Sequence, residues 1–466
     1  MARMSVDLSC LRAPDRRPHR WWGLLAWLPL AAALAQPAPV PPAASEAGAA
    51  PVPMQPAPPV SASAQRLYER TRAQLVQVRT LLKGQASQST VGSAFLVSGG
   101  GHLITNYHVV SQVALQPQRY RLVYTTADGQ EGPLELLAFD AIHDLALVRA
   151  ADGGLAGRKP LAFRPASQGL AKGERIYSLG NPLDVGFAVL EGNYNGLVER
   201  SFYPNIFFAG ALNPGMSGGP ALDEDGRVIG VNVATRRDGQ QVSFLVPAEF
   251  AQQLLERSRD ATPLTQPVYP QLTEQLLRHQ QLLVERFLQQ PWRPAGHPRY
   301  AIPVPQESFM RCWGTTTPAD TKGLEFERSD CQMDTHIFIT DWLHTGGIAV
   351  RHEAYDGRKL GRWRFASMYS RSFANESFPE RTTRHRTAAQ CRERFVDRDG
   401  LPLRAVVCIS AYRKLRGLYD LSVLVATLDH PTMGVQGRFD ARGVDYANAL
   451  KLTEHYLAGY AWTGSH

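Results

Sequence analysis

The segment that most constrains this chain is the glycine-rich run at residues 212–220, LNPGMSGGP. Glycine reaches backbone conformations that a side chain would block, so a Gly-x-Ser-Gly-Gly run can aim two backbone N–H groups at one oxygen atom. Such a run can hold Ser217 as a nucleophile. Gly/Ser-rich loops are also common in ordinary turns, so this interpretation needs support from other parts of the chain.

Two upstream motifs give that support: residues 103–110, LITNYHVV, and residues 143–148, HDLALV. Acyl transfer by a serine needs a base that takes its proton and a carboxylate that orients the base. Taken singly, His108 could be a histidine at a strand end, and Asp144 a turn residue before a buried strand. The order His, Asp, Ser on strand-like flanks is the order of the chymotrypsin-type double barrel, and differs from the orders of subtilisins and α/β-hydrolases.

Further short motifs make the resemblance specific, and their order and spacing agree throughout. They are residues 91–97 (VGSAFLV), 179–182 (LGNP), 228–232 (VIGVN) and 242–247 (VSFLVP). Together with the three motifs above, they resemble the protease domain of HtrA/DegP-type trypsin-like serine proteases over about residues 65–250. This resemblance covers less than half of the chain, and it implies an all-β, chymotrypsin-like double β-barrel.

The resemblance also implies roles for individual residues. His108 would be the general base, Asp144 its orienting carboxylate and Ser217 the nucleophile, with the backbone N–H groups of Gly215 and Ser217 as the oxyanion hole. His143 lies beside Asp144, but neighbours in a strand point to opposite faces, so we expect that the two do not both line the site. No metal or organic cofactor is required.

Substrate preference follows from the serine loop. Ala211 aligns with the floor of the pocket for P1, the substrate residue before the cleaved bond, where trypsin has a carboxylate. Asn232, Val233 and Ala234 would form one wall of that pocket. A small, uncharged pocket predicts a modest preference for aliphatic P1 residues.

Three departures from the family pattern leave a second hypothesis open. Met216 replaces the usual Asn before the serine, residues 208–211 read FAGA where the family has TDAA, and no PDZ-type carboxylate-binding loop follows the protease. The alternative is a latent or degenerate protease fold that acts as a binding or scaffold protein through its C-terminal domain.

The N-terminus is typical of an export signal over residues 1–35. A basic region precedes an apolar stretch at residues 21–34, and residues 33–35 (ALA) supply a small-x-small cleavage site. The apolar stretch is short for a membrane span, although an uncleaved anchor remains an alternative. Residues 36–64, rich in Ala and Pro, predict an extended linker. We therefore expect a periplasmic or secreted protein without stable membrane insertion after cleavage.

Two further regions follow the protease. Residues 251–294 predict a helical connector whose Leu272, Leu276, Leu283 and Phe287 share one packing face. Residues 295–466 predict a separate α+β domain, an antiparallel sheet packed on one or two helices.

The net charge of +8 is modest, and no nucleic-acid-binding motif is visible. The expected partners are protein or peptide substrates, and the sequence does not indicate an oligomeric state.

The cysteine pattern agrees with export. Cys312, Cys331, Cys391 and Cys408 all lie in the C-terminal domain, and an even number in an exported protein favours two disulfides. Three pairings are possible. We expect sequential pairing, Cys312 with Cys331 and Cys391 with Cys408. A zinc site is the alternative, but no Cys-x-x-Cys or neighbouring His pair supports it.

Overall fold

A computed structural model describes residues 61–463 except 86, 236–241, 319, 335, 375–377 and 379–380; the side chains at 234, 235 and 294 are also outside the description. The predicted signal and most of the predicted linker therefore lie outside the described residues. Within the described part, no helix is long and apolar enough to cross a bilayer.

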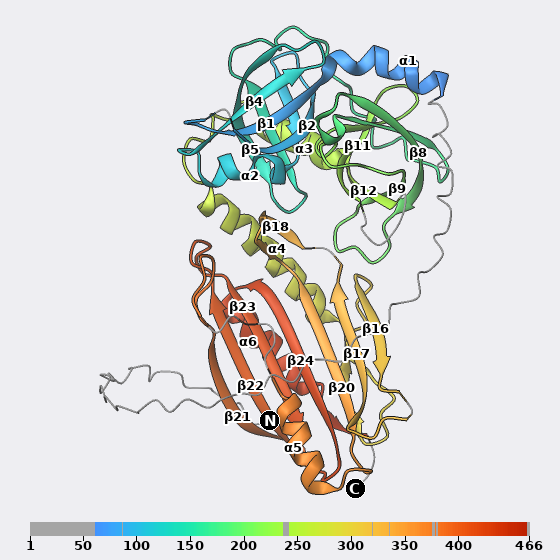
Figure 1. The fold of residues 1–466 in the computed structure, drawn as a ribbon, viewed down its shortest axis with the longest axis vertical. Coiled ribbons are helices and arrows are strands. Elements are labelled where there is room, and N and C mark those ends of the chain that lie inside the picture. The colour runs from blue at the N-terminus through green and yellow to red at the C-terminus, as the bar shows by residue number, and fades with distance from the viewer. Residues whose placement is uncertain are drawn as a thin grey trace, which may run out of the picture. The chain divides into compact units, whose positions relative to one another are not determined.

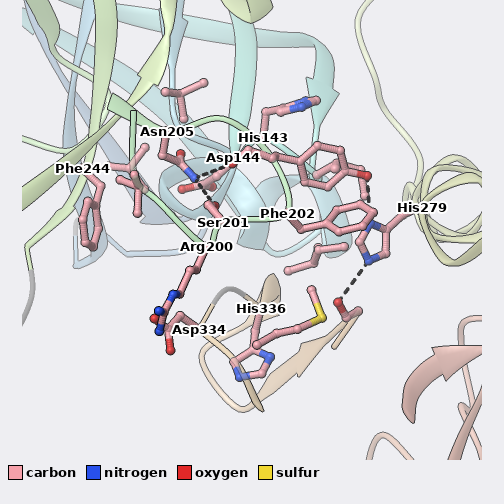
Figure 2. Close-up of a pocket in the computed structure, with 18 of the residues that line it drawn as sticks. His143, Asp144, Arg200, Ser201, Phe202, Asn205, Phe244, His279, Asp334 and His336 are labelled. Atoms are coloured by element: carbon pink, nitrogen blue, oxygen red, sulfur yellow. Dashed lines mark hydrogen bonds between the residues drawn. The ribbon is translucent and has the colours of Figure 1, made fainter. Parts of the chain in front are cut away.

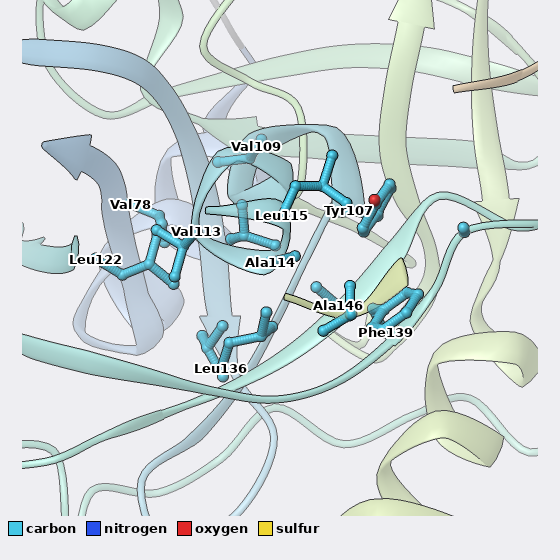
Figure 3. Packing of buried hydrophobic residues seen from close by; sticks show 14 of the residues in the cluster. Val78, Tyr107, Val109, Val113, Ala114, Leu115, Leu122, Leu136, Phe139 and Ala146 are labelled. Atoms are coloured by element: carbon cyan, nitrogen blue, oxygen red, sulfur yellow. The ribbon is translucent and has the colours of Figure 1, made fainter. Parts of the chain in front are cut away.

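The first closed barrel is built from six antiparallel strands in the order β1-β2-β3-β6-β5-β4 (Figure 1). These strands are β1 (Leu75–Leu82), β2 (Gln88–Leu96), β3 (His102–Thr105), β4 (Tyr120–Thr126), β5 (Glu131–Asp140) and β6 (Leu145–Ala150). Helix α2 (Tyr107–Leu115) follows β3 and packs its apolar residues into this barrel. Figure 3 shows this packing, in which Val109, Val113 and Leu115 of α2 belong to the same buried cluster as Val78 and Phe139.

The second closed barrel has the strand order β10-β11-β12-β9-β8-β7. Its strands are β7 (Arg175–Gly180), β8 (Ala188–Leu197), β9 (Ile206–Ala209), β10 (Pro220–Leu222), β11 (Val228–Thr235) and β12 (Val242–Pro247). Two closed six-stranded antiparallel barrels confirm the predicted chymotrypsin-like double barrel.

Helices flank the strands of the barrels. Helix α1 spans Ala62–Thr71, a short 3₁₀ turn follows, and β1 begins at Leu75. The apolar residues from Leu75 onward belong to β1, a strand of the first barrel, so the helix ends before them. Beyond the second barrel come two helices, α3 (Ala248–Ser258) and α4 (Tyr269–Gln289), rather than one continuous helical stretch.

Helix α4 uses one apolar face for two cores. Leu272 and Leu276 are buried with the core of the first barrel, while Leu283 and Phe287 are buried with the C-terminal sheet. The stripe predicted from the sequence is thus a packing face within this protein, and it ties the two parts of the chain together.

The C-terminal part is a seven-stranded antiparallel sheet in the order β16-β17-β20-β24-β23-β22-β21 (Figure 1). In spatial order the strands are Met310–Thr316, Glu325–Met333, Ile348–Asp356, Met433–Val444, Tyr419–Thr427, Leu401–Ala411 and Gln390–Arg398. Helix α6 (Tyr446–Ala458) shares a buried cluster with one face, and α5 (Arg362–Ser372) shares a cluster with Tyr355 and Ala426. A small separate hairpin consists of β18 (Ile337–Thr340) and β19 (Leu343–Thr345). The remaining strands are the two-residue pairs β13 (Arg293–Pro294) with β15 (Pro303–Val304) and β14 (Tyr300–Ala301) with β25 (Ala461–Trp462).

Two disulfides tie the edge strands of this sheet to their neighbours. Cys312 on β16 pairs with Cys331 on β17, and Cys391 on β21 pairs with Cys408 on β22. In both cases the two cysteines are directly opposite in the strand register. The structure therefore has the sequential pairing that we expected. Each disulfide ties one edge strand of the sheet, β16 or β21, to its neighbour.

Candidate active site

His108 and Asp144 form a close pair in the first barrel. His108 lies in the first turn of α2, and Asp144 ends the turn between β5 and β6. The imidazole Nδ1 is 2.6 Å from the Asp144 Oδ2 atom, and the backbone N–H of His108 donates to Oδ1 over 2.8 Å. A carboxylate bonded to Nδ1 fixes the tautomer of the ring and leaves Nε2 free to accept a proton.

Asp144 is held in a backbone conformation that residues with side chains seldom adopt, with φ of +54°. Its carbonyl oxygen accepts from the Asn106 side-chain amide at 2.8 Å and from the Tyr107 N–H at 3.1 Å. These contacts fix the turn, and the start of α2 directs its backbone N–H groups at Asp144. Strain that the surroundings hold in place is typical of functional sites.

The charge of Asp144 governs the protonation of His108. Burial of the imidazole opposes its charged form, but the adjacent Asp144 carboxylate outweighs burial, and Asp341 adds to it. The pKa of His108 is therefore raised above its ordinary value. A histidine base with a raised pKa binds a proton more strongly, and it is free to accept one only at correspondingly higher pH.

The loop that carries Ser217 depends on a glycine conformation. Gly215 has φ of +93°, and a Cβ atom there would lie 2.4 Å from the carbonyl oxygen of Asn181. The Pro214 carbonyl accepts from the Leu183 N–H at 2.8 Å. Because the C=O and N–H of a trans peptide point in opposite directions, this bond turns the Gly215 N–H to the other side of the loop.

The hydroxyl group of Ser217 donates to the carbonyl oxygen of Val233 at 3.1 Å. That carbonyl is accessible because the register of β11 shifts between Asn232 and Ala234, so that Val233 has no directly opposite residue on β12. A hydroxyl has one proton to donate, so in this arrangement it is not donated to His108.

A cavity of about 460 Å³ opens beside these residues. Asp144 and Val233 both line it, together with residues of the loop after β8, helix α4 and the C-terminal part of the chain (Figure 2). His143 lines it too, so the expectation that His143 and Asp144 do not share a site is wrong. Residues 141–144 form a turn, in which the alternation of a strand does not apply.

His143 is nevertheless occupied by other partners. Its Nδ1 atom is 3.0 Å from Asp140 Oδ2, and its ring stacks on Phe250 with centroids 3.8 Å apart. These contacts hold the imidazole against α3, and the carboxylate it uses is Asp140 rather than Asp144.

Of the four predicted pocket residues, Val233 lines the cavity. Asn232 is fully buried, and its side-chain amide donates to the carbonyls of Leu179 and Met216, so it supports the serine loop from behind rather than facing a substrate. Ala211 is exposed, and the side chain of Ala234 lies outside the described residues.

The sequence reasoning missed two groups of residues. The Ser93 hydroxyl bonds Gly215 of the serine loop and the Asn181 N–H after β7, and only its place in the VGSAFLV motif could have indicated this. Phe338, from the C-terminal hairpin, packs edge-on against His108 with ring centroids 5.9 Å apart. No sequence motif connects residue 338 to residue 108.

The trypsin-like peptidase domain family matches residues 92–231, the segment that carries His108, Asp144 and Ser217. This part of the chain is a trypsin-like peptidase domain. The matched segment includes Gly215 and most strands of the two barrels, while β1 and β12 lie outside it.

Several curated proteins are similar to this domain. One is a putative serine protease, HhoB, from Synechocystis, 30% identical over 201 residues, which are 40% of this chain and 46% of the relative. Another is a probable periplasmic serine endoprotease, DegP-like, from Chlamydia pneumoniae, 31% identical over 183 residues, covering 38% of this chain and 36% of the relative. The chain thus spans less than half the length of these relatives.

A similar solved structure is the serine endoprotease from Yersinia pestis. It is 20% identical and has a TM-score of 0.36, covering 43% of this chain and 67% of that one.

Proposed function

We propose that this protein is an exported serine endopeptidase that hydrolyses peptide bonds of proteins. The observation that carries the proposal is the His108–Asp144 pair at 2.6 Å in a trypsin-like peptidase domain whose serine loop has Gly215 at a φ of +93°. Similar proteins that are named periplasmic endoproteases support both export and protein substrates.

In the proposed reaction, Ser217 attacks the carbonyl carbon of the scissile bond while His108 Nε2 takes the hydroxyl proton. Asp144 stabilises the imidazolium that forms, and the N–H groups of Gly215 and Ser217 stabilise the oxyanion of the tetrahedral intermediate. His108 then gives the proton to the leaving amine, and an acyl-enzyme remains. Water, deprotonated by His108, hydrolyses the ester and restores the serine.

Substrate binding would free the serine for this reaction. The Val233 carbonyl accepts the Ser217 hydroxyl at 3.1 Å, and in the proposed complex it would accept the backbone N–H of P1 instead. If the substrate takes over this acceptor, the hydroxyl loses its partner and can rotate about its Cα–Cβ bond to His108. Because Ala211 carries no charge, we expect a preference for small aliphatic P1 residues.

The second candidate is a latent protease fold that serves as a binding protein. The hydroxyl of Ser217 bonded to Val233, and Met216 buried in the second barrel beside it, favour this candidate. It differs from the first in one measurable respect, because a latent serine does not react with an activated phosphonate.

A fluorophosphonate probe tests the proposal on the purified protein. We expect labelling in the wild type and none in Ser217→Ala, with casein hydrolysis lost in the same variant. Folded protein that does not label would contradict the endopeptidase and support the latent fold. Casein hydrolysis that persisted in Ser217→Ala would exclude Ser217 as the nucleophile.

A further inference from the structure

The β18–β19 hairpin of the C-terminal part packs on the protease domain at its catalytic histidine. Ile337, Ile339 and Leu343 are buried in the same cluster as the core of the first barrel. Phe338 contacts both α2 residues at the site, with its ring centroid 5.9 Å from His108 and 6.4 Å from Tyr107. The hairpin therefore belongs to the packing of the peptidase domain, although it follows that domain by more than 80 residues.

A buried histidine joins the base of this hairpin to the second barrel. His279 of α4 lies 3.0 Å through Nε2 from the carbonyl oxygen of Gly346, directly after β19, and 2.9 Å through Nδ1 from the Tyr203 hydroxyl (Figure 2). Burial lowers the pKa of His279 to about 4, so the ring is neutral at physiological pH. A neutral ring has one donor and one acceptor, and these match the carbonyl and the hydroxyl.

The cavity beside Asp144 is lined by residues of both parts of the chain. Met333, His336 and Ile337 of the C-terminal part line it together with Val198 and Phe244 of the second barrel. Arg311 also lines it, and its charge is balanced by an ion pair with Asp334 at 2.6 Å. The walls are thus mainly apolar, with Arg200 as a further positive charge among the lining residues.

The part of a substrate that reaches this cavity follows from the positions of Ser217 and Val233. With the scissile carbonyl at Ser217 and the P1 N–H on the Val233 carbonyl, the chain that continues past Val233 consists of the residues before P1. The first of these, P2, would pass between Val233 and the His108 ring. Its side chain would meet Phe338, and the residues before it would enter the cavity.

We infer that the C-terminal domain supplies a wall of the substrate cleft, in which Phe338 determines the preference for the P2 residue and the cavity lined by Met333 accepts apolar residues before it. This inference rests on the proposed function. The occupant is an extended peptide segment with apolar side chains, since the exposed walls of the cavity are mainly apolar.

Peptide substrates that differ only at P2 test the inference. In the full-length protein, Phe338→Ala should lower kcat/KM about tenfold for a substrate with Leu at P2, as expected for a lost apolar contact in a binding pocket. The substrate with Gly at P2 should change less than about twofold, because it has no side chain to lose the contact. Phe338→Leu should restore most of the preference, and Trp363→Ala, on the remote helix α5 and 76% exposed, is the matched control.

The outcomes separate this inference from the proposed function. A fluorophosphonate probe carries no P2 residue. Its reaction with Ser217 in each variant therefore reports whether the triad works, independently of the P2 contact. Absence of labelling in the wild type would overturn the proposed function itself. Labelling with an unchanged Leu-to-Gly ratio in Phe338→Ala would overturn only the cleft wall. A uniform loss for both peptides, or a rise for Leu, would also contradict it.

Discussion

The Ser93 hydroxyl donates a hydrogen bond of 2.7 Å to the carbonyl oxygen of Gly215 and accepts one of 2.9 Å from the backbone N–H of Asn181. The Ser93 backbone N–H also donates to the carbonyl of Ser217 at 2.8 Å. Ser93 lies on β2 of the first barrel. Ser217 lies in the loop between β9 and β10 of the second barrel. One serine on the first barrel therefore fixes the backbone of the loop that holds the nucleophile on the second.

We predict that Ser93→Ala lowers kcat about tenfold. The Gly215 carbonyl would lose its partner, and the loop would no longer hold the Gly215 N–H in place, although this donor would not be removed altogether. Complete removal of an oxyanion donor costs about 10²–10³ in kcat, so a tenfold loss is the expected order for a misplaced one. Steady-state kinetics on a peptide substrate measure this, with the exposed Ser87→Ala as control. A kcat equal to that of the wild type would show that the loop keeps its form without Ser93.

Gly215→Ala should abolish activity while the domain stays folded. The added Cβ atom would lie 2.4 Å from the Asn181 carbonyl oxygen, and the φ of +93° is unfavourable for alanine. The loop must therefore move, and the candidate oxyanion hole moves with it. Fluorophosphonate labelling and circular dichroism measure the two effects separately. Gly99→Ala is the matched control, because a Cβ at Gly99 meets nothing within 4 Å.

The double barrel and the pairing of His108 with Asp144 could be predicted from the sequence, because short motifs in a fixed order along the chain carry them. Each motif specifies a strand end or a turn, and the two barrels follow from short β-branched runs separated by turns. The sequence reasoning misplaced His143 because the rule of alternation was applied to a turn. It also placed Asn232 on the substrate side, whereas the two carbonyls behind the serine loop require its amide.

The role of the C-terminal part could not be predicted from local patterns. The contact between Phe338 and His108 joins residues 230 positions apart, and it depends on how α4 shares its apolar face between two cores. Periodicity predicted that α4 has an apolar face, but a periodic stripe does not tell which surface covers it. Long-range packing of this kind is visible only in the structure.

The pH dependence of activity should respond to Asp341 on the β18–β19 hairpin. The charge of Asp341 helps to raise the pKa of His108, after the larger effects of burial and Asp144. His108 acts as a base only when neutral, so kcat/KM rises as pH rises through this pKa. Asp341→Asn removes one negative charge, lowers the pKa and shifts the acidic limb of the profile to lower pH. The shift should be small, because Asp341 is exposed and its charge is screened by solvent and salt.

A pH profile of kcat/KM in low salt measures this shift. The control is Asp260→Asn, an exposed carboxylate whose charge acts on His102 instead. A profile of Asp341→Asn that superimposes on the wild type, with the control also unchanged, would show that the hairpin carboxylate does not influence the catalytic base.

Glu307 should make the protein less stable as pH rises. Burial raises the pKa of Glu307 to about 7, although Arg286 pulls it down. Its folded pKa therefore lies above the unfolded value near 4.5, so its favourable contribution is complete below pH 4.5 and is lost as pH rises through 7. At pH 8 the folded protein must hold a charged carboxylate that is 8% exposed. Glu307→Gln removes that charge and should stabilise the protein at pH 8 by about 1–2 kcal/mol, with no gain at pH 4.5.

Thermal unfolding of wild type and Glu307→Gln at the two pH values measures this difference. Glu454→Gln, at an exposed position of α6, controls for the loss of a negative charge as such. If the midpoint of Glu307→Gln exceeds that of the wild type at pH 8 and the gap closes at pH 4.5, the buried carboxylate is the cause. A gap of equal size at both pH values would instead assign the effect to packing of the amide, because the charge on Glu307 is absent at the lower pH.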